Sequence, residues 1–199
     1  MFPDLLRQKV GFVGLSPAQI EALEGHYRLL QRWNKVLNLT TVDSLEEAVE
    51  RHYGESFFLA RHLPQEVVTI ADIGSGAGFP GIPVAIFNPD WRVTLIESHQ
   101  RKAVFLREAT RGLGNVRVIA RRAEEMEERF DCAISRAVSY EDLVPVLKKI
   151  SKNADLLTGG EAPPVELGFE WEEPIPLPWG KSRFLRIGVS RGTPSVRFT

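Results

Sequence analysis

The segment TIADIGSGAGFPGIPVAIF, residues 69 to 87, restricts the fold of this chain more than any other stretch. A short apolar run ends at Ile73, a glycine-rich turn follows, and a second apolar run begins after Pro80. Glycine adopts positive φ and lets a ligand approach the backbone, and proline is tolerated in the first turn of a helix because its missing N–H has no partner there. The pattern predicts a strand, a glycine turn and a helix in direct succession, with a ligand pocket at the turn.

Short strands and helical segments continue to alternate after this turn. Strands are predicted within VVTIADIG (67–74), WRVTLIES (91–98), VRVIARR (116–122) and DCAISRA (131–137), and helices from Pro80, over 100–112 and within SYEDLVPVLKKIS (139–151). Such alternation is typical of an α/β fold, in which helices cover both faces of a mostly parallel sheet.

The first sixty residues are predicted to be helical. Ser16 and Gln19 occupy the N-cap and capping-box positions of a helix over residues 16–38, along which apolar residues recur at helical spacing. A second capping box, Ser44-x-x-Glu47, opens a helix that we expect to reach about residue 63.

The C-terminal part is of a different kind. The Pro/Gly-rich stretch TGGEAPPVELGFEWEEPIPLPWG (158–180) is expected to be irregular or extended, whereas KSRFLRIGVSRG (181–192) alternates like an exposed strand and VRF (196–198) follows it. We expect two or three terminal strands, at least some of them antiparallel. The predicted organisation is therefore a helical extension, residues 1–65, and a Rossmann-like domain, residues 66–199.

Bulk composition names no partner. A charged fraction of 26% and a net charge of -1 are ordinary for a soluble protein. The first residues, MFPDLLRQKV, lack the basic start and apolar run of a signal peptide, and no apolar run reaches membrane-spanning length, so a cytoplasmic location is expected. The single cysteine, Cys132, excludes an internal disulfide or a thiolate metal site, and the four histidines show no metal-binding spacing. We expect no metal.

Two interpretations of the glycine loop predict different cofactors. From Gly76 the loop reads GAGFPG, the G-x-G-x-x-G pattern of nicotinamide or flavin enzymes. A dinucleotide pyrophosphate would bind free N–H groups at the helix N-terminus, and Pro80 and Pro83 remove two of these donors. From Asp72 the loop reads Asp-x-Gly-x-Gly-x-Gly, which is similar to the first motif of S-adenosylmethionine-dependent methyltransferases. The prolines favour the second interpretation.

Acidic residues near the strand ends fit such a pocket. Asp72 suits an ammonium or sulfonium charge, and Glu97, about twenty residues after the loop, is placed to hold ribose hydroxyls. Its alternative role is a solvated carboxylate. Ala123 and Glu124 follow the third strand, where they either receive the adenine edge or simply begin a helix, since acidic residues favour a first turn.

Six segments together resemble one family. They are RWNKVLNLTTV, RHYGESFFL, DIGSGAGFPGIPVAI, LIESHQRKAVFL, RRAEE and DCAISRAVS, and they cover roughly residues 25 to 150. In this order they resemble the glucose-inhibited division protein B family of bacterial 16S ribosomal RNA guanine-N7 methyltransferases. The resemblance implies a class I methyltransferase fold with an N-terminal helical extension, S-adenosylmethionine as cofactor, and 16S ribosomal RNA or the small ribosomal subunit as partner of a monomeric, membrane-free enzyme.

The resemblance also places functional residues. It assigns contacts with S-adenosylmethionine to Gly74, Phe79, Ala123, Glu124 and Arg136, and it matches Glu97 to the ribose-holding position. The loop adds Asp72, Gly76 and Gly78 to the expected cofactor-binding residues. One motif departs from the family, because His52-x-x-Glu55-Ser56 stands where the family usually has His-x-x-Asp-Ser.

The implied reaction needs little chemistry from the protein. Guanine N7 carries a free lone pair, so its attack on a sulfonium methyl group requires no general base, and catalysis is mainly orientation. Asn38 and Arg136 are the expected substrate-positioning residues; the alternatives are a helix C-cap for Asn38 and a surface ion pair with Asp131 or Glu141 for Arg136.

The sequence leaves two alternative functions open. A nicotinamide oxidoreductase predicts a sixth parallel strand, and a non-catalytic RNA-binding or ribosome-assembly factor predicts the same fold without turnover. Basic residues are frequent between Arg92 and Arg122 and from Lys181 onward, which permits an RNA-binding face without establishing one.

Overall fold

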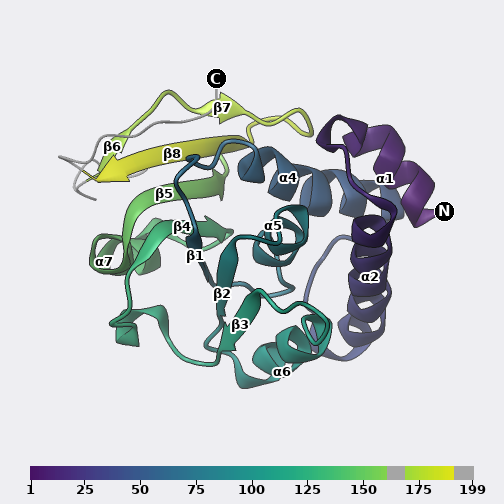
Figure 1. Ribbon diagram of the computed structural model, residues 1–199, viewed down its shortest axis with the longest axis horizontal. Helices are drawn as coiled ribbons and strands as arrows, with labels where there is room; N and C mark the ends of the chain where they lie inside the picture. Colours follow the sequence, from purple (N-terminus) through teal and green to yellow (C-terminus); the bar gives the residue numbers. More distant parts are fainter. Residues whose placement is uncertain (161–168, 191–199) are drawn as a thin grey trace.

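The protein is described by a computed structural model covering residues 1–160 and 169–190 (Figure 1). Its sheet has the strand order β3-β2-β1-β4-β5-β8-β6, with β7 also paired to β8. Five strands are parallel: β1 (Thr69–Ile73), β2 (Arg92–Ile96), β3 (Val116–Ile119), β4 (Phe130–Arg136) and β5 (Ser151–Thr158). Strand β8 (Phe184–Ser190) runs antiparallel to β5, β6 (Phe169–Trp171) and β7 (Ile175–Pro176). The predicted α/β class is confirmed.

Helices cover both faces of this sheet (Figure 1). Helices α5 (Gly81–Phe87), α6 (Gln100–Ala109) and α7 (Tyr140–Ile150) connect the parallel strands, and η3 (Ala123–Glu125) is a short 3-10 turn. The predicted helix over 100–112 thus ends at Ala109. The N-terminal helices α1 (Phe2–Val10) and α2 (Pro17–Leu37) follow one another through the 3-10 turn η1 (Gly11–Val13). Both members of the Ser16 and Gln19 capping box are present, as predicted.

The helix predicted to run from Ser44 to about residue 63 is interrupted. Its capping bond is present, because Ser44 Oγ accepts the Glu47 N–H at 3.1 Å. It then passes from α3 (Leu45–Glu47) through a π-helical segment, η2 (Ala48–Gly54), into α4 (Glu55–Ala60). Such π-helical segments occur often at functional sites, because the wider turn redirects side chains.

The core has two parts, one on each face of the sheet. Successive residues of a strand point to opposite faces, so Ile70 and Ile134 pack with the N-terminal helices, whereas Ala71 and Ala133 pack with α7. The first part extends from Phe2 in α1 through the sheet and joins the N-terminal helices to it. No helix in the described ranges is long and apolar enough to cross a membrane.

Strand β5 was not predicted from the sequence. Its residues include Asn153 and Asp155, which are polar and nevertheless buried, so the apolar pattern of a central strand is broken. Asn153 is accommodated because its Nδ2 donates to the Asp131 carbonyl at 2.9 Å. The expectation of antiparallel terminal strands is confirmed by β6, β7 and β8, and the segment VRF (196–198) lies outside the described residues.

Candidate active site

The turn after β1 requires glycine at two positions. Gly74 has φ +70°, and a Cβ there would lie 2.6 Å from Val138 Cγ2. Gly78 has φ +87°, and a Cβ there would lie 2.4 Å from Ile82 Cδ1. Positive φ and the lack of space both exclude larger side chains. The turn therefore brings bare backbone to the carboxyl end of the sheet, where ligands bind in open α/β folds.

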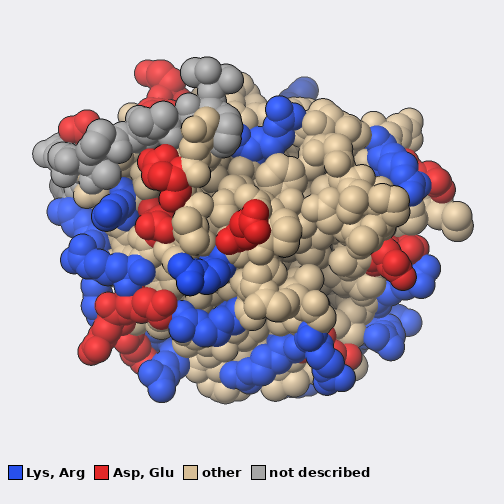
Figure 2. Space-filling model, viewed as in Figure 1, with Lys and Arg blue, Asp and Glu red and all other residues tan. Residues whose placement is uncertain are grey.

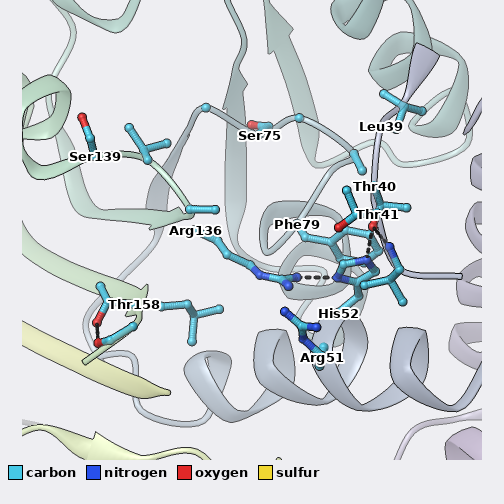
Figure 3. A pocket seen from close by; sticks show the side chains of 18 of the residues that line it. Leu39, Thr40, Thr41, Arg51, His52, Ser75, Phe79, Arg136, Ser139 and Thr158 are labelled. Carbon is cyan, nitrogen blue, oxygen red and sulfur yellow. Dashed lines mark hydrogen bonds between the residues drawn. The ribbon is translucent and has the colours of Figure 1, made fainter. Parts of the chain in front are cut away.

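A cavity of about 1450 Å³ opens beside this turn (Figure 3). It lies at the carboxyl ends of β1, β4 and β5, and the segment after α2 closes another side. Its walls include Asn38–Val42, Arg51, His52, Gly74–Ala77, Phe79, Lys102, Arg136–Glu141, Pro145, Leu157–Gly160 and Arg183. The helical extension thus supplies one wall and the sheet supplies the other.

Two acidic residues lie beneath the glycine turn. Asp72 is fully buried; its Oδ2 accepts the Gly81 N–H at 3.0 Å, while Oδ1 has no hydrogen-bond partner in the described part of the chain. Burial raises the pKa of Asp72 from 3.8 to about 7. Glu97 is also buried, and its two oxygens accept the N–H groups of Gly76 (2.9 Å) and His99 (2.7 Å). Glu97 is therefore not a solvated carboxylate.

On the opposite side of the cavity, one carboxylate holds two arginines. Glu55 is fully buried, and Arg183 donates to both of its oxygens, from Nε and Nη2, at 2.6 Å each. Arg136 Nε lies 3.7 Å from Glu55 Oε2. Burial lowers the pKa of Arg136 to about 10, although Glu55 opposes this effect. The alternative that Arg136 pairs with Asp131 or Glu141 is wrong, since its carboxylate partner is Glu55.

His52, a residue of the extension, lies between Arg136 and Thr40 (Figure 3). Arg136 Nη1 donates to His52 Nδ1 at 2.5 Å, and His52 Nε2 lies 2.8 Å from Thr40 Oγ1. The imidazole stacks on Phe79 with a centroid distance of 4.5 Å. Burial, reinforced by the charge of Arg136, lowers the pKa of His52 to about 2. His52 is thus neutral, with its proton on Nε2 donated to Thr40.

Comparison with known proteins identifies the family. The model of a family described as rRNA small subunit methyltransferase G matches residues 19–159. This chain belongs to that family. Two relatives, both called ribosomal RNA small subunit methyltransferase G, are similar to it over most of its length. That of Nitrosomonas europaea is 40% identical over 152 residues, covering 71% of this chain and 70% of its own length. That of Dictyoglomus thermophilum is 34% identical over 182 residues, covering 86% and 75%.

Solved structures agree on the fold of this methyltransferase G family member. A SAM-dependent methyltransferase from Aquifex aeolicus matches with a TM-score of 0.57 and 17% identity, covering 72% of this chain and 93% of its own. A ribosomal protein L11 methylase from Lactobacillus delbrueckii matches with a TM-score of 0.59 and 14% identity, covering 71% and 80%. The predicted class I methyltransferase fold and the family resemblance are confirmed.

The structure brings half of the predicted site residues of this chain into the cavity wall. Those that line it are Asn38, Gly74, Gly76, Phe79 and Arg136. Those that do not are Asp72, Gly78, Glu97, Ala123 and Glu124. Asp72, Gly78 and Glu97 support the turn from behind, and Ala123 and Glu124 form η3, just beyond β3. Asn38 also has φ +46° at the end of α2, so its role as a helix C-cap is confirmed.

Sequence reasoning assigned no role in the site to five residues that lie in or beside the cavity: Thr40, Arg51, His52, Glu55 and Arg183. Only His52 and Glu55 carried a local signal, because residues three apart in a helical segment share one side. Arg183 lies 128 residues from Glu55 in sequence, and nothing in its surroundings marks it as their partner.

Proposed function

We propose that this chain transfers the methyl group of S-adenosylmethionine to N7 of a guanine in 16S ribosomal RNA. The observation that carries the proposal is the cavity in which the family's glycine turn meets Arg136 and His52. A cytoplasmic, monomeric enzyme acting on RNA or the small ribosomal subunit is part of the same proposal.

The residues under the glycine turn fit this cofactor. Gly74 and Gly76 line the cavity with bare backbone, and Asp72 Oδ1 is a buried oxygen without a partner in the described ranges. Each Glu97 oxygen accepts one N–H, so a second lone pair on each is left for ribose hydroxyls. When bound, S-adenosylmethionine supplies an electrophilic methyl group on a positively charged sulfur. We assign its binding to Asp72, Gly74, Gly76, Gly78, Phe79, Glu97, Ala123, Glu124 and Arg136.

The other wall suits a guanine. Arg136 is held by Glu55 and His52, so its remaining donors have a fixed direction, and Asn38 lies across the cavity. We assign positioning of the base to these two residues. His52 has both ring nitrogens engaged and is neutral, so it does not serve as a base, and N7 needs none. Holding N7 and the methyl group in line supplies several kcal/mol, roughly, of the barrier reduction.

Surface charge supports RNA as the substrate. Figure 2 shows Lys and Arg side chains along the lower edge of this face, over α6. Arg101 and Arg107 of α6 and Arg111, two residues after it, are exposed, and Lys102 of α6 reaches the cavity wall. Basic groups on one face bind the phosphates of a nucleic acid. The nicotinamide alternative predicts a sixth parallel strand, whereas β8, beside the fifth parallel strand of the described sheet, is antiparallel.

The test is transfer of a labelled methyl group to small ribosomal subunits that lack native modification, with naked 16S ribosomal RNA alongside and the labelled nucleotide mapped. We expect label at one guanine N7. Glu97→Gln should lower both cofactor affinity and transfer, and Arg7→Gln, an exposed position on α1, is the matched control. Absence of label with normal binding of S-adenosylhomocysteine would contradict the enzyme and favour an assembly factor.

A further inference from the structure

The acceptor side of the cavity holds more positive than negative charge. Arg51, Arg136 and Arg183 line it together, and we call them the arginine cluster. Their carboxylate partners are Glu55, shared by Arg136 and Arg183, and Glu47, which pairs with Arg51. Within these ion pairs, three cations are thus matched by two anions. The side chains of Arg136 and Arg183 are only 12% and 22% exposed, so water screens the excess charge poorly.

Donors of the cluster remain unused. Arg183 directs Nε and Nη2 at Glu55, which leaves Nη1 without a partner among the residues that the structure describes. Arg51 Nε is buried and equally unpartnered within the described ranges. A guanidinium has five N–H donors in one plane and binds carboxylate or phosphate oxygens with two of them at once. Both arginines therefore retain donors for a further oxyanion.

The charge of the cluster decides what kind of ligand it suits. A sulfonium is a cation, and a guanine acquires positive charge as N7 is methylated, so the cluster suits neither of these groups; it suits an oxyanion, either a phosphate of the RNA or the carboxylate of S-adenosylmethionine. A phosphodiester carries one negative charge, which equals the excess of the cluster. Charge-assisted bonds from arginine to phosphate are among the stronger hydrogen bonds in proteins, and a buried cation is stabilised by such a partner.

We propose that Arg51 and Arg183 bind a backbone phosphate of the RNA next to the target guanine, and that Glu55 positions Arg183 for this contact. The inference rests on the proposed function, since it names how the same cavity holds its RNA. The phosphate contact anchors the nucleotide, while Arg136, held between His52 and Glu55, is left to orient the base.

The test compares Arg51→Gln and Arg183→Gln with Arg7→Gln, which removes an exposed arginine on α1 outside the cavity. Arg51→Gln leaves the Glu55 ion pairs intact, so it covers the case in which Arg183→Gln unfolds the protein. Binding of 16S ribosomal RNA is measured without turnover, in the presence of S-adenosylhomocysteine and over a series of salt concentrations, and cofactor affinity is measured by calorimetry.

We expect each cluster variant to bind RNA about tenfold more weakly or worse, with a salt dependence lower by about one phosphate contact. Cofactor affinity should stay within about twofold of that of Arg7→Gln, and under turnover the loss should lie in KM. Loss of cofactor affinity with an unchanged salt dependence would overturn the proposal and assign the cluster to the cofactor carboxylate. Because RNA binding is read without methyl transfer, failure of the proposed reaction is distinguishable from failure of this contact.

Discussion

Replacing Asp72 with asparagine should make the ligand-free protein more stable at alkaline pH. The Asp72 carboxyl group is fully buried, only one of its oxygens is hydrogen-bonded within the described ranges, and burial raises its pKa from 3.8 to about 7. Above pH 7 the native state must hold this carboxylate ionised in a site that disfavours its charge. The asparagine side chain would keep an oxygen for the Gly81 N–H and remove the charge.

The expected size follows from proton linkage. Between about pH 4 and pH 7 the native state binds a proton at Asp72 that the unfolded state has released, so the free energy of unfolding falls as pH rises. The slope approaches about 1.4 kcal/mol per pH unit and falls to half of that at the native pKa, which gives a loss of about 2 kcal/mol between about pH 5 and pH 7 and about 3 kcal/mol by about pH 8. The pKa values of His26 and His52 are lowered to about 4 and about 2, so these residues make the free energy of unfolding rise with pH. Wild type and Asp72→Asn share this contribution.

The assay is urea denaturation of wild type and Asp72→Asn at several pH values from about 5 to 8, without cofactor. The difference between the two free energies of unfolding isolates Asp72, and it should shift by about 3 kcal/mol in favour of the variant as pH rises. In parallel, S-adenosylhomocysteine should bind the variant about tenfold more weakly, because the unpartnered oxygen of the carboxylate is gone. A difference that does not change with pH would refute the argument from burial.

Three further predictions concern the two walls of the cavity. Gly76→Ala should cost about 1–2 kcal/mol of unfolding free energy for its positive φ alone, whereas Gly78→Ala should cost more, because its Cβ would lie 2.4 Å from an isoleucine side chain; equal losses in urea denaturation would contradict this. Glu55→Gln should lower the free energy of unfolding by about 3–5 kcal/mol, because it leaves buried guanidinium groups without their carboxylate. Glu47→Gln, which breaks a partly exposed ion pair, should lower it by about 1 kcal/mol or less. Thermal denaturation of the two variants tests this order. The pH profile of kcat/KM should show no ionisation from His52 between about pH 5 and pH 8, because its pKa is about 2; an inflection near 6.5 that is absent in His52→Gln would contradict it.

Elements whose determinants are local were predictable from sequence. The capping box at Ser16 and Gln19 and the alternation of short strands with helices depend on neighbours a few residues away, and both are present. Strand β5 was not predictable in this way, since the buried Asn153 is tolerated near its start because the Asp131 carbonyl of the adjacent strand accepts its amide N–H. The π-helical segment η2 likewise has no sequence signature that we recognised.

The two walls of the cavity differ in the same respect. The glycine turn and Glu97 belong to consecutive strands, and a motif of fixed spacing describes them. The acceptor wall is assembled from the extension, the end of β4 and the segment before β8, so the ion pair of Glu55 with Arg183 joins residues 128 positions apart. Distances of this kind are set by the fold, and no local pattern carries them.

The two walls of the cavity draw on different parts of the predicted organisation into residues 1–65 and 66–199. Asp72 and Glu97 lie on β1 and at the end of β2, so both belong to the second part, whereas Arg136, which is assigned to cofactor and base alike, is held by residues of the first. The acceptor wall needs His52 and Glu55 from the first part, and Glu55 is held by an arginine from β4 and another next to β8. Substitutions that loosen the packing of the N-terminal helices should therefore weaken RNA methylation before they weaken cofactor binding, because only the acceptor wall depends on all three segments being in place.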